Sequence, residues 1–287
     1  MKQILYLLSI YPLRTAFLLC DMLFAILPIS FLNLIGSFKV TKKNIEIAFP
    51  GLAKEDTLLL SKQSYKETLK SFYESIFAWS RSRQKIVIET RRINDRFFFT
   101  DPKNNSGLVV FSLHNRSIDF MLRWLSTQRA HTSLYKKIKF NALNAHVKKV
   151  REEGGNTLVE TGIGGVKSIM SALNKGQMTC MASDQVPADG LGKYSIFFNH
   201  ECYSFSLAPS LAKKTSKPTL MVNLSFENNL GHTISFIKPD DRIATDEGVH
   251  FMNKAMEQAI LKKPEEYSWE YKKYRKLSSD TKDIYKI

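Results

Sequence analysis

The segment SLHNRSIDF, residues 112–120, places a histidine and an aspartate five positions apart where an apolar run ends. A histidine titrates near neutral pH, so His114 can act as a general base. A carboxylate at Asp119 can fold back to fix the imidazole tautomer and to stabilise its charged form. The spacing therefore indicates a candidate catalytic pair. The plainer alternative is that Asp119 caps a helix and that His114 is incidental.

The flanking segments predict where this pair lies. Residues 107–113, GLVVFSL, form a continuous apolar run of strand length. The following IDFMLRWLSTQ is typical of a helix, with Ser117 as its N-cap. We therefore expect His114 at the carboxyl end of a buried strand and Asp119 in the first turn of the next helix. Open α/β sheets place their functional groups at such positions.

Apolar strand-like runs and helical patterns continue to alternate along the chain, which predicts a mostly parallel central sheet flanked by helices. We expect strands in HTSLY, NTLVE, MTCMAS, YSIFF, PTLMVNLSF and HTISFI, and helices over 141–151, after Gly165, in SFSLAPSLAKKT and from about Glu247. The segment GIGG, residues 162–165, lacks the spacing of a nucleotide-binding loop and favours a turn that begins a helix.

The N-terminal region differs from the rest of the chain in composition. Residues 16–35 are apolar apart from Asp21, Pro28 and Asn33, and their length is close to that of a bilayer-spanning helix. We predict a membrane anchor over residues 1–37 and an α/β domain over residues 38–287.

A stretch containing three lysines, residues 39–43, follows this apolar segment, so the positive-inside rule predicts a cytoplasmic catalytic domain. A buried core helix and a cleaved signal peptide are the alternatives to an anchor. Beyond the anchor, apolar residues recur at helical spacing between Leu58 and Phe77, with Lys62, Lys66 and Lys70 on the polar face.

The composition narrows the class of partner. The 287 residues carry 42 Lys and Arg against 27 Asp and Glu, a net charge of +15, which favours an anionic partner. Three cysteines without a C-x-x-C spacing predict neither a disulfide framework nor a zinc site, and we expect no metal and no cofactor. A basic membrane-binding or nucleic-acid-binding protein without enzymatic activity stays open at this point, although helical spacing of the aromatic residues favours packing over nucleic-acid binding.

Four segments taken in order resemble the bacterial lipid A late acyltransferases, within the wider lysophospholipid acyltransferase group. They are SLHNRSID, VREEGGNTLVETGIGGVKSIMSALNKGQ, CMASDQVPADGLGKYSIFFN and PEEYSWEYKKYRK. The group shares a His-x4-Asp or His-x4-Glu signature, and the resemblance extends from the N-terminal region to about Lys276.

The resemblance implies transfer of a fatty acyl chain from acyl carrier protein to a hydroxyl of a lipid A precursor, on the cytoplasmic face of the bacterial inner membrane. By position, His114 and Asp119 match the catalytic pair of the family. Arg151 matches an arginine near the acceptor or the developing charge, and Asp184 and Gln185 match the family's Asp-Gln at the end of a later strand. The acidic carrier protein and the phosphorylated lipid would both suit a basic enzyme, and no nucleic acid is expected.

Two positions depart from the family pattern. The family usually has His-x-Gly-Asn-Trp-Glu, whereas this chain has a shorter acid at Asp119 and an unusual preceding segment, Asn115–Ile118. FFNHE replaces Phe-Phe-Gly. These changes affect the choice of acceptor more than the fold, so another lysophospholipid or a glycolipid is the alternative acceptor.

The chemistry of acyl transfer agrees with these residues. Transfer from a thioester needs a base for the acceptor hydroxyl and donors for the tetrahedral oxyanion, and it needs no covalent enzyme nucleophile. The serine-hydrolase motif G-x-S-x-G does not occur in the sequence, so Ser112 and Ser117 are not expected to act as nucleophiles.

Overall fold

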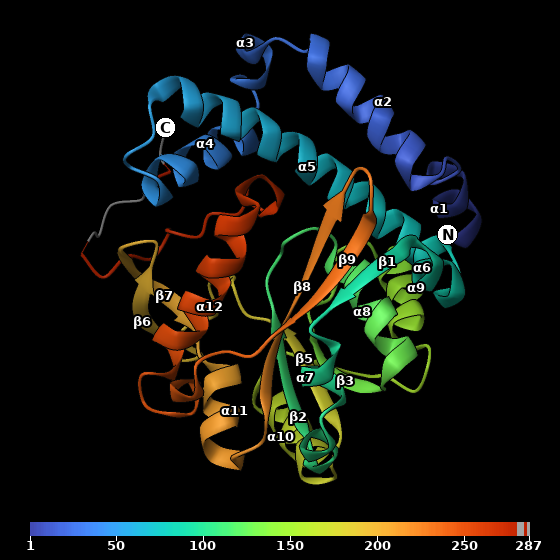
Figure 1. Ribbon diagram of the computed structural model, residues 1–287, viewed down its shortest axis with the longest axis vertical. Helices are drawn as coiled ribbons and strands as arrows, with labels where there is room; N and C mark the ends of the chain where they lie inside the picture. The colour runs from blue at the N-terminus through green and yellow to red at the C-terminus, as the bar shows by residue number, and fades with distance from the viewer. Residues whose placement is uncertain (280–283, 286–287) are drawn as a thin grey trace.

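A seven-stranded sheet forms the centre of the protein (Figure 1). The computed structural model describes residues 1–279 and 284–285, so part of the C-terminal end of the predicted domain 38–287 lies outside the described residues. In spatial order the strands are β1 (Thr90–Asn94), β9 (Gly231–Ile237), β8 (Thr219–Glu227), β2 (Leu108–Ser112), β5 (Met178–Ala182), β3 (His131–Tyr135) and β4 (Thr157–Glu160). Strands β6 (Gly192–Phe197) and β7 (His200–Phe205) form a separate antiparallel hairpin.

The sheet is mostly parallel, as expected. Five adjacent strands run parallel, and the antiparallel pairing of β8 with β9 reverses the last two. The helices are α1 (Lys2–Leu8), α2 (Leu13–Ile26), α3 (Ile29–Leu32), α4 (Gly36–Ala48), α5 (Lys54–Ser80), α6 (Arg83–Glu89), α7 (Arg96–Thr100), α8 (Ile118–Gln128), α9 (Asn141–Glu152), α10 (Ile163–Asn174), α11 (Leu207–Thr215) and α12 (Gly248–Lys262). Three short 3-10 helices are η1 (Pro102–Ser106), η2 (Asp241–Ala244) and η3 (Pro264–Glu266).

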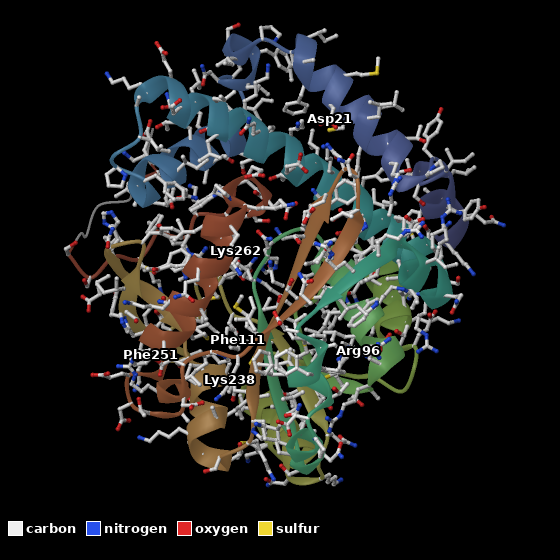
Figure 2. All side chains as sticks on the ribbon, viewed as in Figure 1. Asp21, Arg96, Phe111, Lys238, Phe251 and Lys262 are labelled. Atoms are coloured by element: carbon white, nitrogen blue, oxygen red, sulfur yellow. The ribbon has the colours of Figure 1, made fainter. Side chains whose placement is uncertain are left out.

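Strand β2 shows how the sequence builds two cores from one apolar run. Successive side chains of a strand point to opposite faces, so a run buried on both sides needs no polar alternation. Val109 and Phe111 belong to the core that includes α10, α11 and α12, whereas Leu108 and Val110 belong to the core that includes α2, α5 and α8. Figure 2 shows Phe111 near the centre of the molecule.

The predicted strands and helices of the central region are confirmed, with two omissions and one shifted boundary. Strands β1 and β7 were not expected, because both are edge elements with mixed polar composition. The segment SFSLAPSLAKKT begins in β7, and its helix starts only at Leu207. The turn expected at GIGG is confirmed: Gly162 is the residue before α10, and a Cβ on Gly165 would lie 2.0 Å from the carbonyl oxygen of Glu160.

Helix α5 is buried only in part on the face that we expected: Ile76 and Phe77 of the predicted apolar face are buried. Leu59, Leu69 and Phe72, predicted on the apolar face, are exposed. Lys70, predicted on the polar face, is buried, with its ammonium 2.7 Å from Asp21 and 2.9 Å from Glu67. The expectation was wrong because α2 covers α5 and brings Asp21 over the lysine side (Figure 2).

The N-terminal region forms short helices rather than one long one. Pro28 separates α2 from α3, and Phe17 of α2 packs edge-on against Phe226 with ring centroids 4.8 Å apart. No helix among the described residues is by itself long and apolar enough to cross a membrane. Helices α1 and α2 together satisfy the length and composition, but they are bent by 56° where they meet. The single N-terminal membrane helix therefore stays a prediction.

Candidate active site

His114 and Asp184 meet because two adjacent parallel strands end in register. Strand β2 pairs with β5 so that Ser112 lies opposite Ala182, and each functional residue lies two positions beyond its strand. The chain leaves β2 toward α8 on one face of the sheet and leaves β5 toward the hairpin and α11 on the other. The loops therefore diverge at the carboxyl edge of the sheet, which is the usual position of an α/β site.

The contact between these two residues fixes the imidazole. Asp184 is buried, and its carboxylate accepts from the His114 backbone N–H at 3.2 Å and from Nδ1 at 2.8 Å. Since a carboxylate only accepts, Nδ1 carries a proton and Nε2 is left with its lone pair. The His114 side chain is 30% exposed, so the Nε2 edge can reach a substrate.

The electrostatics of the pair favour a protonatable histidine. Burial alone would lower the pKa of His114, but the charge and hydrogen bond of Asp184 outweigh it and raise that pKa. Burial likewise would raise the pKa of Asp184, yet His114 and Lys273 hold it below its usual range. His114 can therefore accept a proton while Asp184 stays ionised.

Two further side chains lie close to the histidine. The Gln185 side-chain amide nitrogen is 3.4 Å from His114 Nε2. Glu270, which accepts a hydrogen bond from Thr68 at 3.0 Å, is close enough to raise the pKa of His114, and its own pKa is raised chiefly by burial. The site thus has an amide beside Nε2 and a second carboxyl close enough to influence the histidine.

Asp119 lies in the first turn of α8, as predicted, but its hydrogen-bond partner is Arg151. The Arg151 Nε and Nη2 atoms donate to the two Asp119 carboxylate oxygens at 2.6 and 3.0 Å. From the sequence we expected Asp119 to orient His114, and that expectation requires correction. Asp184 makes the Nδ1 contact because β5 lies next to β2, while the α9 arginine takes both oxygens of Asp119.

The unusual residue Arg116 ties the loop to α5. Its guanidinium is fully buried and donates to Glu74, at 2.9 Å through Nε, and to Glu67. The backbone N–H of Ser117 and the His232 ring also contact the Glu74 carboxylate, at 3.1 and 2.8 Å. Burial alone would raise the pKa of Glu74, but the charges of Arg116 and His232 lower it to about 2.

This network holds a strained turn. Arg116 has a φ of 60°, a left-handed conformation that non-glycine residues rarely adopt. The family pattern has glycine, asparagine and tryptophan in the segment between the histidine and the acid, and this chain instead uses a buried ion pair in that segment. The turn therefore depends on its tertiary contacts.

The C-terminal PEEYSWE segment braces the same loop from the other side. Ser268 N–H donates to the His114 carbonyl at 3.0 Å, and Arg116 N–H donates to the Glu266 carbonyl at 3.2 Å. The Trp269 indole donates to the Pro264 carbonyl at 2.7 Å and so folds the segment on itself. These contacts explain why so distinctive a motif lies far from the histidine in sequence.

Sequence reasoning found His114, Asp184 and Gln185 but missed other residues that shape the site. Glu74 and Glu270 carry no recognisable spacing relative to the histidine, and Lys273, which donates to the Asp184 carbonyl at 2.7 Å, appeared only as part of a motif. A buried glutamate on the inner side of a long helix is the one signal that could have drawn attention to Glu74.

The structure offers no candidate metal centre within residues 1–279 and 284–285: no group of three or more His, Cys, Asp or Glu side chains is arranged to hold an ion. His200 and Cys202, which lie two positions apart in β7, have other surroundings. His200 Nε2 contacts the Ile47 carbonyl at 3.2 Å, and Cys202 is buried in the core.

The chain thus combines an α/β fold with a candidate acid–base site, the histidine–aspartate pair at the carboxyl edge of the sheet. Residues 4–276 match the bacterial lipid A biosynthesis acyltransferases, and the chain therefore belongs to this family and is an acyltransferase. It is 21% identical over 244 residues to a lipid A biosynthesis palmitoleoyltransferase of Escherichia coli strain K12, and equally to a lipid A biosynthesis acyltransferase of Shigella flexneri. Each alignment covers 82% of this chain and 78% of the relative.

Proposed function

We propose that the protein transfers a fatty acyl chain from acyl carrier protein to a hydroxyl of a lipid A precursor, with His114 as the general base. The observation that carries the proposal is the 2.8 Å contact between His114 Nδ1 and Asp184, because it places the proton on Nδ1 and leaves Nε2, on a partly exposed side chain, with the lone pair that a base needs. Family membership supports acyl transfer to a lipid acceptor.

The reaction then has two steps at one histidine. Nε2 takes the proton from the acceptor hydroxyl as its oxygen bonds to the thioester carbonyl carbon, giving a tetrahedral oxyanion. When this collapses, the carbon–sulfur bond breaks and the thiolate takes the proton from the imidazolium. Asp184 stays ionised and stabilises the imidazolium throughout.

Arg151 and Gln185 are the side chains that we assign to the oxyanion or to the acceptor. Gln185 lies beside Nε2, and Arg151 is held in a fixed orientation by both oxygens of Asp119. A preoriented donor stabilises developing charge without reorganising during the reaction, which is the usual source of the largest catalytic effect. In this proposal Asp119 acts through Arg151.

The apolar surface of the N-terminal helices supports a place at the cytoplasmic face of the inner membrane. Helices α1 to α3 expose large apolar side chains, whereas their polar contacts point toward α5. The exposed residues include Ile4, Leu7, Leu8, Leu18, Leu19, Met22, Leu23, Ile26 and Phe31. An enzyme that acylates a lipid needs such contact with the interface, and a surface of this kind can enter the headgroup region without a spanning helix.

A direct assay tests donor and acceptor together. Purified protein is incubated with radiolabelled acyl-acyl carrier protein or acyl-coenzyme A, and with a lipid A precursor or lysophosphatidic acid. We expect one new ester on the lipid A precursor, formed from the carrier-protein donor. Acylation of lysophosphatidic acid alone would reassign the acceptor, and transfer from neither donor would contradict the proposed function.

A further inference from the structure

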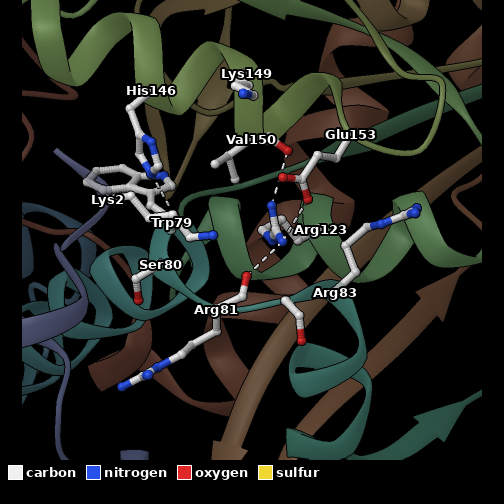
Figure 3. Close-up of a pocket in the computed structure, with 11 residues that line it drawn as sticks. Lys2, Trp79, Ser80, Arg81, Arg83, Arg123, His146, Lys149, Val150 and Glu153 are labelled. Carbon is white, nitrogen blue, oxygen red and sulfur yellow. Dashed lines mark hydrogen bonds and ion pairs between the residues drawn. The ribbon is translucent and has the colours of Figure 1, made fainter.

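A basic cavity is lined partly by residues of α8 and α9, the two helices that carry Asp119 and Arg151, and it plays no part in the reaction proposed above. It has a volume of about 510 Å³ and is bounded by α1, the end of α5, α8 and α9 (Figure 3). Lys2, Arg81, Arg83, Arg123, His146 and Lys149 contribute basic groups, and Glu153 contributes a carboxylate. A cavity with this excess of cations favours an anionic occupant.

Its innermost cation is built into the fold. The Arg123 side chain is 3% exposed and donates to the carbonyls of Val150 at 3.1 Å and Arg81 at 2.8 Å. Its Nη2 is 3.1 Å from Glu153. Figure 3 shows these contacts converging on Arg123.

Two residues that line this cavity carry a buried donor without a partner in the described part of the chain, namely Arg123 Nε and the Trp79 indole Nε1. A buried donor without a partner costs free energy, so such groups call for an explanation in a ligand or ordered water. His146 Nε2 donates to the Trp79 carbonyl at 2.8 Å and so keeps the indole segment in place. The residues that line the cavity therefore supply several cations and one neutral donor without a partner, the Trp79 indole, which suits a phosphate.

An adjoining hollow indicates what the phosphate is attached to. A second cavity of about 470 Å³ shares Lys2, Ser80, Arg81 and Ser82 with the first and is completed largely by Tyr6, Ile10, Tyr11, Pro12 and Phe77. Tyr6 of α1, and Ile10 and Tyr11 in the connection between α1 and α2, are exposed in the same N-terminal region that carries the apolar surface. A charged headgroup in the first cavity would thus have its apolar part beside an apolar hollow.

The site is also connected to the candidate active site. Arg123 follows Asp119 by one turn of α8, and Lys149 and Val150 directly precede Arg151 on α9. We propose that this basic cavity, defined by Arg123, Trp79 and Lys149, binds the phosphate ester of an amphiphilic lipid. An occupant would contact the same two helices that hold the Asp119–Arg151 pair.

Trp79 gives a direct readout of occupancy, since the other two tryptophans, Trp124 and Trp269, are buried in the cores. The full-length protein is titrated with dihexanoyl phosphatidic acid below its micelle concentration, and with glycerol 3-phosphate and inorganic phosphate, while tryptophan emission is followed. We expect a saturable change with the lipid that is lost in Trp79→Phe. Glycerol 3-phosphate should bind at least about ten-fold more weakly, because it lacks the acyl chains.

The matched variants are Lys149→Gln and Lys148→Gln, which remove the same charge from neighbouring positions of α9. Only Lys149 lines the cavity, and Lys148 is half exposed in a pair with Glu152. Lys149→Gln should weaken lipid binding about ten-fold through loss of a charge-assisted contact, and Lys148→Gln should leave it within about two-fold.

Three results would overturn the proposal. They are a lipid titration without a Trp79-dependent signal, equal losses in the two lysine variants, and glycerol 3-phosphate binding as tightly as the lipid, which would reduce the site to an anion site. Unfolding midpoints in urea show whether each variant is folded. Because binding is measured without acyl transfer, failure of the enzymatic assay does not decide this test.

Discussion

At the residue scale, the chemistry depends on which carboxylate faces His114 Nδ1. The structure gives this contact to Asp184 at 2.8 Å and gives Asp119 to Arg151. Local spacing could not distinguish these partners, because β5 lies between β2 and β3 in the sheet although two other strands and three helices separate it from β2 in the sequence. The sequence predicts the histidine at a strand end, but the order of the strands decides its partner.

The first prediction concerns the pH dependence of the rate. A general base must be unprotonated, so kcat/KM should fall as pH drops below the raised pKa of His114. In Asp184→Asn the pKa of His114 should fall, because the opposing charge is lost while burial remains. The acidic limb of the pH–rate profile should therefore move to lower pH, and the plateau should drop roughly 10²- to 10⁴-fold.

Asp189→Asn is the matched control, since Asp189 follows in the same loop and is 91% exposed in its pair with Lys276. It should change neither the limb nor the plateau. An Asp184→Asn enzyme with the wild-type acidic limb would show that Asp184 does not set the pKa of the base.

The second prediction separates the charge of Arg151 from its geometry. Arg151→Lys keeps the charge but loses the two-point contact with Asp119, so kcat/KM should fall about ten-fold or more. Arg242→Lys breaks a similar two-point contact with Asp240 at an exposed position and should leave the rate unchanged. Equal rates for Arg151→Lys and wild type would leave Arg151 a purely structural residue.

At the scale of elements, helix α5 and the η3 segment hold the loop that carries His114 and Arg116 from two sides. Hydrophobic patterning predicted the strands and helices of the central region well, because a sheet covered on both faces produces long apolar runs. It misplaced part of the buried face of α5, since a charged residue such as Lys70 can be buried when Asp21 and Glu67 accompany it. The Arg116–Glu74 ion pair could not be predicted either, because hydrophobic patterning places charged residues at the surface.

The third prediction tests that pair through stability. Arg116→Met leaves the Glu74 carboxylate buried without its arginine, and the free energy of unfolding in urea should fall by about 3–5 kcal/mol. Lys213→Met breaks an exposed pair with Asp246, which solvent screens, and should leave the free energy of unfolding almost unchanged. If Arg116→Met unfolds like Lys213→Met, the loop does not depend on α5.

At the scale of the whole molecule, the apolar N-terminal helices are connected to the candidate active site through helix α5. Helix α2 packs on α5, and Glu74 of α5 contacts Ser117 in the loop that carries His114. A lipid surface in contact with α1 to α3 would thus be separated from the candidate active site by helix α5. Sequence hydropathy revealed the apolar segment, but it could not show that the segment folds back along α5.

The fourth prediction tests this surface by flotation with anionic vesicles. Ile26→Glu places a charge on a side chain of α2 that is 81% exposed, and the partition coefficient should fall about ten-fold or more, since burying one isoleucine contributes about 1.5–3 kcal/mol. Leu261→Glu makes the same change on α12, at a residue 57% exposed, and should bind like wild type. Equal binding by all three proteins would locate membrane contact elsewhere.

The central claim is that His114 is the base of the acyl transfer, and single-turnover transfer from labelled acyl-acyl carrier protein to the lipid A precursor tests it most directly. Wild type, His114→Ala, Asp184→Asn and the double variant are compared after their unfolding midpoints have shown that each is folded. His114→Ala should lose most of the rate, and the double variant should be little slower, because two residues that act as a unit give strongly non-additive losses. A folded His114→Ala protein that transfers the acyl chain at a near-normal rate would contradict the mechanism.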